Sequence, residues 1–260
     1  MFKISIPPEE IEKMPLGAFP GKICVIDKIG IEFVKAIAYL RTQKVIGFDT
    51  ETRPVFSPGQ RHNHVALLQL SGPRKAYLFR VGQIGMRKLL CGVLSNPHII
   101  KVGAAVHDDV RGLQYYQRFD EKGFVDLQKI AYEWGIRDKS VKKLAANILG
   151  VRISKSQQLS NWEAEQLTAS QQMYAATDAW VCREMYLKLL KSEKHPLTPE
   201  ELNPPQPQPV APKEAPQETP APAAQPEEGQ KPKPKRRRRR RKPKKPQEAP
   251  AAPVQEKSNG

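Results

Sequence analysis

"GFDTETRP", residues 47–54, continues an apolar run that starts at Val45, and it holds two carboxylates, Asp49 and Glu51, one residue apart. Val, Ile and Phe in close succession are typical of a buried strand, which we expect to end at Asp49. Side chains two apart on a strand share a face. Two carboxylates on one face repel each other unless a cation lies between them, and such an all-oxygen site suits Mg²⁺ or Mn²⁺. A solvated strand end with two surface acids fits the stretch equally well.

A second pair of acids follows another apolar run. In "KVGAAVHDDVRGLQ", residues 101–114, we expect a strand to pass through Gly103 into a helix whose first turn holds Asp108 and Asp109. An aspartate at a helix start commonly caps the helix by accepting backbone N–H bonds. We expect that role for one of the two, which leaves the other free for a second role.

A tyrosine and an aspartate lie four residues apart in "YAATDAW", residues 174–180. If this stretch is helical, Tyr174 and Asp178 share one face. A Tyr–Asp pair of this kind is more often a local hydrogen bond than a catalytic pair, and the stretch alone favours the hydrogen bond.

The charge of the chain indicates a polyanionic partner. Its 260 residues include 43 Lys+Arg and 27 Asp+Glu, a formal net charge of +16, which suits nucleic acid or an acidic membrane surface. No apolar run is long enough for a transmembrane helix, and the N-terminus lacks the apolar core of a signal peptide. Three scattered cysteines without CxxC spacing indicate a reduced intracellular protein. We therefore expect a cytoplasmic protein.

Composition divides the chain into an N-terminal arm (1–21), one folded domain (22–192) and a disordered tail (193–260). From residue 196 onward the chain has 17 of its 25 prolines and no aromatic residue, so it cannot bury enough apolar surface to fold. A basic cluster, residues 231–245, holds 12 Lys+Arg and no acid. It suits nucleic-acid binding, although a solubilising segment or, in a eukaryote, a nuclear localisation signal has the same composition.

Within the folded part, strands come first and then alternate with helices, which predicts an α/β domain with a mixed sheet. Besides the strand before Asp49, we expect strands at 23–26, 64–72, 75–81 and 98–105, the middle two as a hairpin. We expect helices at 31–40, 86–94, 108–116, 126–134, 140–149 and 162–191, the last as one long helix or two short ones. The apolar face of the 31–40 helix comprises Phe33, Ala36, Ile37 and Leu40.

The motifs together resemble the DEDD superfamily of 3′–5′ exonucleases, in the subclass with a tyrosine in the third motif. This subclass includes ribonuclease D and the exonuclease domain of the Werner syndrome helicase. "FDTE", "LLQL", "KVG…DD", "SNW" and "YAATDA" fall in the family's order over roughly residues 22–190. The resemblance implies a ribonuclease-H-like fold, a mixed sheet flanked by helices.

The resemblance also implies the chemistry. Asp49, Glu51, Asp109 and Asp178 match the ligands of two divalent ions, Mg²⁺ or Mn²⁺, with Asp109 favoured over Asp108. One ion would lower the pKa of a bound water, and the other would stabilise charge on the leaving 3′ oxygen. Tyr174 would orient the water, because a free tyrosine has a pKa of about 10 and makes a poor base. The expected reaction removes nucleoside 5′-monophosphates from the 3′ end of DNA or RNA, without a small-molecule cofactor.

Two further regions are candidates for nucleic-acid contacts. Lys155 and Asn161 lie in "KSQQLSNW", just before the third motif, although Ser160 or Asn161 is also an ordinary helix cap. The basic cluster contributes Arg236, Arg237, Arg238, Arg239, Arg240 and Arg241, which should add salt-sensitive affinity for phosphate backbones. The alternative function is a catalytically inactive nucleic-acid-binding protein that acts through this tail.

Overall fold

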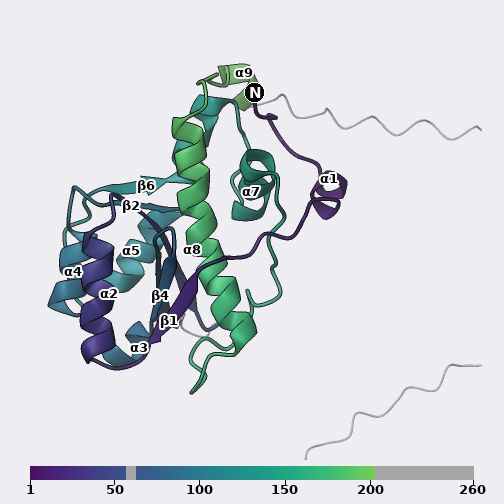
Figure 1. Ribbon diagram of the computed structural model, residues 1–260. Coiled ribbons are helices and arrows are strands. Elements are labelled where there is room, and N and C mark those ends of the chain that lie inside the picture. The colour runs from purple at the N-terminus through teal and green to yellow at the C-terminus, as the bar shows by residue number, and fades with distance from the viewer. Residues whose placement is uncertain (57–62, 203–260) are drawn as a thin grey trace, which may run out of the picture. The chain divides into compact units, whose positions relative to one another are not determined.

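The first two acids lie on an interior strand of a mixed sheet. The computed structural model describes residues 1–56 and 63–202 (Figure 1). Six strands pair in the order β1-β4-β3-β2-β5-β6. Their bounds are β1 Lys22–Ile26, β2 Val45–Thr52, β3 Val65–Ser71, β4 Lys75–Phe79, β5 Ile100–Gly103 and β6 Phe124–Asp126. β3 is antiparallel to β2 and β4, whereas the other pairs are parallel. The predicted mixed sheet and the β3–β4 hairpin are confirmed.

Helices cover both faces of this sheet. Their bounds are α1 Pro8–Glu12, α2 Ile31–Arg41, α3 Val81–Ile84, α4 Lys88–Leu94, α5 Val106–Gln114, α6 Leu127–Ile130, a 3₁₀ helix η1 Ala131–Trp134, α7 Val141–Leu149, α8 Ala169–Leu190 and α9 Pro199–Leu202. Side chains of α2, α4 and α5 share a buried core with one face of the sheet, and α8 crosses the other face and packs against α7 (Figure 1). The predicted α/β class is confirmed.

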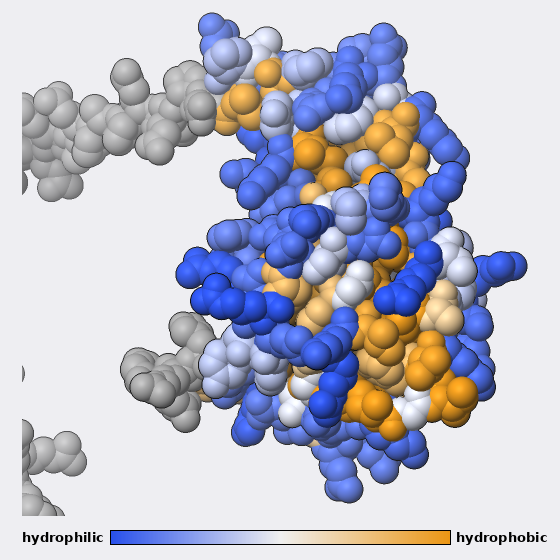
Figure 2. Space-filling model, turned by 90° about the vertical axis from the view of Figure 1, so that its left-hand side faces the viewer, coloured by the Kyte–Doolittle hydropathy of each residue, from blue (hydrophilic) through white to orange (hydrophobic). Residues whose placement is uncertain are grey.

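The periodicity of α2 was predicted correctly. Phe33, Ala36, Ile37 and Leu40 are all buried, at most 3% exposed. The surface on the side of α2 and α4 is mixed in hydropathy. Figure 2 shows hydrophobic patches between hydrophilic side chains on this side of the molecule. One apolar residue of α2, Ile31, is 67% exposed.

Strand alternation sends the side chains of β2 to two different surroundings. Ile46 and Phe48 belong to the core beneath α2, α4 and α5. The odd-numbered positions face α8 instead, and one of them is Gly47, where a Cβ atom would lie 1.7 Å from the backbone oxygen of Ala179. The backbones of β2 and α8 therefore touch at this point, which only glycine permits. Asp49 and Glu51 follow on the same face.

The predicted end of β2 and the predicted start of the last long helix are wrong, because tertiary contacts and not the local sequence set these boundaries. β2 does not end at Asp49 but continues to Thr52, since β3 remains paired with it as far as Val65. The last long helix begins at Ala169 rather than near Trp162. The reason is that the carbonyls of Ala164 and Glu165 accept hydrogen bonds from the buried guanidinium of Arg80 and not from helical N–H groups.

Two other expectations also need correction. The helix expected at 126–134 is present as α6 followed by the 3₁₀ helix η1, but its first residue, Asp126, belongs to the short strand β6. Asp126 ends that strand and caps α6, because its carboxylate accepts the N–H of Gln128 at 3.0 Å. The helix expected at 108–116 begins at Val106 and ends at Gln114.

The N-terminal arm is part of the described structure, whereas most of the predicted C-terminal tail is not. Residues 1–21 include α1 and bury Ile6, Ile11 and Phe19, and the N–H of Phe19 donates to Thr177 Oγ1 at 3.0 Å. Most of the predicted tail, with its basic cluster 231–245, lies outside the described residues. Within the described part of the chain, no helix has the length and apolar character needed to cross a membrane.

Replacing Gly47 by alanine should destabilise the fold by roughly 1–3 kcal/mol or more, because the new methyl group would overlap the α8 backbone. Gly92→Ala is the matched control, since this exposed position in α4 meets only the side chain of Arg41 at 3.5 Å. In a helix interior that change should stabilise by about 0.5–1 kcal/mol. Urea unfolding of both variants measures the difference, and equal stabilities would refute the backbone contact.

Candidate active site

The acids lie where β2 extends beyond its neighbour β5. The last residue of β2 that pairs with β5 is Gly47, opposite Val102, so the strand from Phe48 onward pairs with β3 alone. The chain leaves β5 through Gly103 and turns sharply at Ala105, which has a left-handed φ of 60°. This departure frees one edge of β2 for side chains that arrive from α5 and α8.

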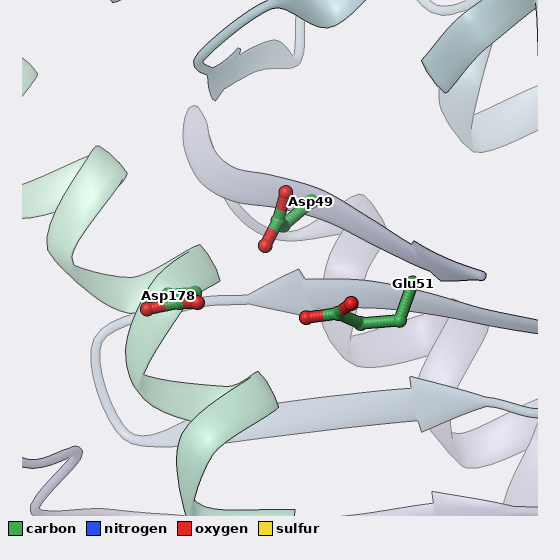
Figure 3. Close-up of side chains that lie close together, drawn as sticks. All are labelled: Asp49, Glu51 and Asp178. Atoms are coloured by element: carbon green, nitrogen blue, oxygen red, sulfur yellow. The ribbon is translucent and has the colours of Figure 1, made fainter. Parts of the chain in front are cut away.

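Three carboxylates meet beside this stretch of β2. Asp49 and Glu51 come from the strand and Asp178 from α8, and one ligand oxygen from each lies within 4.8 Å of the others. Figure 3 shows the two strand acids directed towards the helical one. The contact at Gly47 produces this meeting, because Asp178 directly precedes Ala179, whose carbonyl lies against the strand.

Burial and mutual repulsion make these acids hold protons tightly. Burial, followed by the charges of Asp178 and Asp109, raises the pKa of Glu51 to about 9, and the same causes raise the pKa of Asp49 well above its usual value. Burial raises the pKa of Asp178 to about 7, opposed by a hydrogen bond with Tyr174 and by the charge of Lys155. Grouped oxygen donors that repel one another fit a divalent cation, which would replace the protons.

Asp109 stands next to this group but outside its tight cluster. It lies in the first turn of α5, and its carboxylate accepts a hydrogen bond from Thr50 Oγ1 at 2.6 Å. Burial raises its pKa to about 6, and the Thr50 hydrogen bond opposes the rise. Its charge reaches Asp49 and Glu51, whose pKa values it raises. Asp108 is exposed, so Asp109 is the one of the two that lies beside the acids, and its role as a metal ligand stays a prediction.

The expected capping role for one of these aspartates is wrong. The N-cap of α5 is Ala105, and no side chain caps the helix there. The helix starts two residues earlier than expected, which moves Asp108 and Asp109 beyond the cap position. The Ala105 N–H donates to the carboxylate of Asp126 at 3.1 Å instead.

Tyr174 lies one helical turn before Asp178, as the spacing predicted. Burial, with added effects of Asp178 and Glu51, raises the pKa of its hydroxyl above the ordinary tyrosine value. The hydroxyl therefore keeps its proton at neutral pH and can donate it in a hydrogen bond. The Tyr174 ring is partly buried beside Trp162, with ring centroids 6.0 Å apart.

The acids open into a cavity of about 260 Å³ whose rim carries polar side chains. Besides Asp49, Glu51, Tyr174 and Asp178, its lining includes Ser140, Lys142, Ser154, Lys155 and Gln158. The structure thus brings Lys155 to the acids, and its contact with nucleic acid stays a prediction. It does not bring Asn161 there, because that residue lines a neighbouring cavity with Arg53.

The helix cap expected at Ser160 or Asn161 is also wrong. Asn161 Oδ1 accepts the N–H of Glu163 at 3.1 Å, but no helix starts there. The cap of α8 is Thr168, which forms a capping box with Gln171. The six arginines from Arg236 to Arg241 lie outside the described residues.

Sequence reasoning missed Thr50, the residue between the first two acids. Strand alternation could have identified it, because a residue between two that face α8 must point to the α5 side of the sheet. That side is where Asp109 arrives. The small side chains of the cavity rim, such as Ser140 and Ser154, carry no sequence signal of their own.

Comparison with known proteins identifies the domain. A family model described as 3′–5′ exonuclease matches residues 28–193. The bifunctional 3′–5′ exonuclease/ATP-dependent helicase WRN of Mus musculus is 31% identical over 194 residues, covering 68% of this chain and 13% of that protein. The chain spans less than two thirds of the length of the curated relatives it matches.

Two solved structures share the fold. The EXO domain of Aedes aegypti Nibbler superposes with a TM-score of 0.57 at 22% identity, covering 67% of this chain and 91% of that one. Escherichia coli RNase D, described as an exoribonuclease involved in structured RNA processing, gives 0.58 at 23% identity, covering 65% and 44%. Such identities bear on the fold alone, and the expected ribonuclease-H-like architecture is confirmed.

Glu51→Gln should raise the stability of the metal-free protein at pH 8. The pKa of Glu51 is about 9 when folded, against about 4.3 for a free glutamate, so the folded state binds the extra proton. The free energy of unfolding of the unsubstituted protein therefore falls as pH rises from about 4 to about 9. A gain of about 1 kcal/mol would raise Tm by roughly 2–4 °C.

Thermal melts in EDTA between pH 5 and 9 measure this gain. Glu121→Gln, at an exposed position, is the control and should leave Tm unchanged at every pH. A Glu51→Gln protein that melts below the unsubstituted one at pH 8 would contradict the account of the site.

Proposed function

Because the chain belongs to the 3′–5′ exonuclease family, we propose that it hydrolyses the 3′-terminal phosphodiester bond of a nucleic acid and releases nucleoside 5′-monophosphates. The observation that carries this proposal is the close group of Asp49, Glu51 and Asp178. With Asp109, these residues would hold two divalent ions, Mg²⁺ or Mn²⁺. When bound, such ions supply activation of a water molecule and stabilise charge on the leaving oxygen.

The chain's own residues would bind and orient the substrate around this group. Lys155 lies on the cavity rim, close enough for its charge to affect Asp178, and it would attract the terminal phosphate. Asn161 would contact the strand further from its 3′ end. The arginines of the basic cluster would add affinity for any phosphate backbone and so raise the local concentration of nucleic acid.

Tyr174 would orient the attacking water and not accept its proton. The raised pKa of the hydroxyl supports this role, because a group that keeps its proton can donate a hydrogen bond but cannot serve as a base. The proton of the water would pass to solvent, because the four carboxylates would be engaged with the divalent ions.

A digestion assay tests the proposal. The protein should shorten 5′-labelled single strands from the 3′ end in Mg²⁺ or Mn²⁺ and not in EDTA. Asp178→Asn and Asp109→Asn should each lower kcat by on the order of 10²–10³ or more, because each removes charge needed around the reacting phosphate. Asp108→Asn, at the exposed neighbour, is the matched control and should digest at the unsubstituted rate.

DNA and RNA substrates run side by side would identify the preferred sugar. A protein that binds both strands but gives no ladder with either metal would refute the exonuclease and favour the inactive nucleic-acid-binding alternative.

Tyr174→Phe should lower kcat about 10²-fold with little change in KM, since a misplaced nucleophile costs about that much. The phenylalanine keeps the ring against Trp162 and removes only the hydroxyl. Steady-state kinetics on one oligonucleotide measure both constants. An unchanged kcat would exclude Tyr174 from the reaction, and a raised KM alone would make it a substrate-binding residue.

A further inference from the structure

A second, larger cavity lies apart from the acids, where β3 begins and β4 ends. Its volume is about 620 Å³. Its walls come from the start of β3, the end of β4, the end of α5 and the loop before α8, and they include His64, Tyr115, Tyr116, Arg80 and Trp162. None of these residues has a role in the proposed reaction at the carboxylates.

Two aromatic rings form one wall of this cavity. The rings of His64 and Tyr115 are stacked, with centroids 3.7 Å apart and planes inclined by 12°. Each covers only one face of the other, and both residues are exposed, Tyr115 to 65%. Tyr116 supports them: its ring meets His64 edge-on, and its hydroxyl donates to the Val65 carbonyl at 2.8 Å. Tyr116 therefore fixes the position of the stacked pair, whose outer ring faces are exposed to solvent.

Polar side chains form another part of the cavity lining. Arg80 is 3% exposed, and its guanidinium donates to the carbonyls of Ala164 and Glu165, which fixes the loop carrying the fully buried Trp162. Gln83 and Glu163 also line the cavity and offer hydrogen-bonding groups. An exposed aromatic surface in a cavity that also carries polar side chains suits a flat ligand with an apolar face and a polar edge, which describes a nucleobase.

A third cavity has lining residues that adjoin those of both the aromatic cavity and the acidic one. This third cavity of about 390 Å³, lined by Arg53, Phe56, Leu159 and Asn161, shares Asn63 with the aromatic one. Two of its lining residues are also close in sequence to residues of the acidic cavity. Leu159 follows Gln158, and Arg53 lies two residues after Glu51. Arg53 pairs with Glu163 at 3.3 Å, and both side chains are about half exposed, so Arg53 can exchange that partner for a phosphate.

We propose that the aromatic cavity binds a base of the substrate strand, upstream of the 3′ end, by stacking on the Tyr115–His64 pair. This inference rests on the proposed function and specifies where a single strand runs once its 3′ end is at the carboxylates. Stacking is tolerant of sequence because every base has an aromatic face. The site therefore measures the length of the single strand and does not read its sequence.

A binding experiment without turnover tests the site directly. Full-length protein carrying Asp178→Asn is mixed with single-stranded oligonucleotides that hold 2-aminopurine at one position, moved stepwise from the 3′ end. Fluorescence should be quenched at an internal position as well as at the terminus. Adding Tyr115→Ala should abolish the internal quenching and weaken binding roughly 5- to 100-fold, whereas Tyr115→Phe, which keeps the ring, should change neither.

Two further variants guard against a folding defect. His64→Ala removes the other ring from a different element and should reproduce the loss. Tyr132→Ala removes a tyrosine that is 42% exposed on η1, outside the cavity, and should have no effect. Absence of internal quenching, or an equal loss with Tyr132→Ala, would overturn the proposal.

Kinetics on the otherwise unsubstituted protein separate this proposal from the exonuclease function. KM should fall as substrates lengthen from two to about ten nucleotides, and Tyr115→Ala should make that fall smaller without changing turnover of the dinucleotide. An identical length dependence in both proteins would overturn the stacking site and leave the exonuclease standing. Internal quenching in a protein that never digests would refute the exonuclease and leave the stacking site standing.

Discussion

The backbone contact between β2 and α8 at Gly47 is the constraint on which the site depends. With no side chain at Gly47, the helix lies directly against the strand, and Asp178 reaches the two acids that β2 presents on the same face. The shortness of β5 supplies the second requirement, because it leaves one edge of β2 open to α5 and Asp109. Two elements distant in the sequence thus converge on one strand, and a larger residue at Gly47 would separate them.

The sequence was informative where the signal is local and periodic. The buried face of α2, the β3–β4 hairpin and the position of Tyr174 one turn before Asp178 all follow from spacing. It was less informative where distant groups decide the outcome. The loop at 162–168 has helix-like composition, but Arg80 binds its carbonyls, and the brief strand β6 forms only because β5 offers an edge.

The same division applies to the site. Asp49, Glu51 and Asp178 were found from motif order, and the structure brings them within 4.8 Å. Asp109 was placed correctly near them, but no local motif indicates its hydrogen bond with Thr50, since the two residues are 59 apart in the chain and meet only on the α5 side of the sheet. His64 and Tyr115 lie about fifty residues apart in the sequence and belong to no motif, so only the fold shows that their rings stack.

The crowded carboxylates have an evolutionary consequence. The fold does not need them, since the hydrophobic cores and the Gly47 contact hold β2 and α8 together without any charge. Natural proteins sit just above a stability threshold, and residues that lower stability persist where function requires them. A copy of this domain released from its chemical task would gain stability by losing an acid, so neutral drift would remove them early. This chain carries all four acids together with Tyr174, the full set that the proposed chemistry requires.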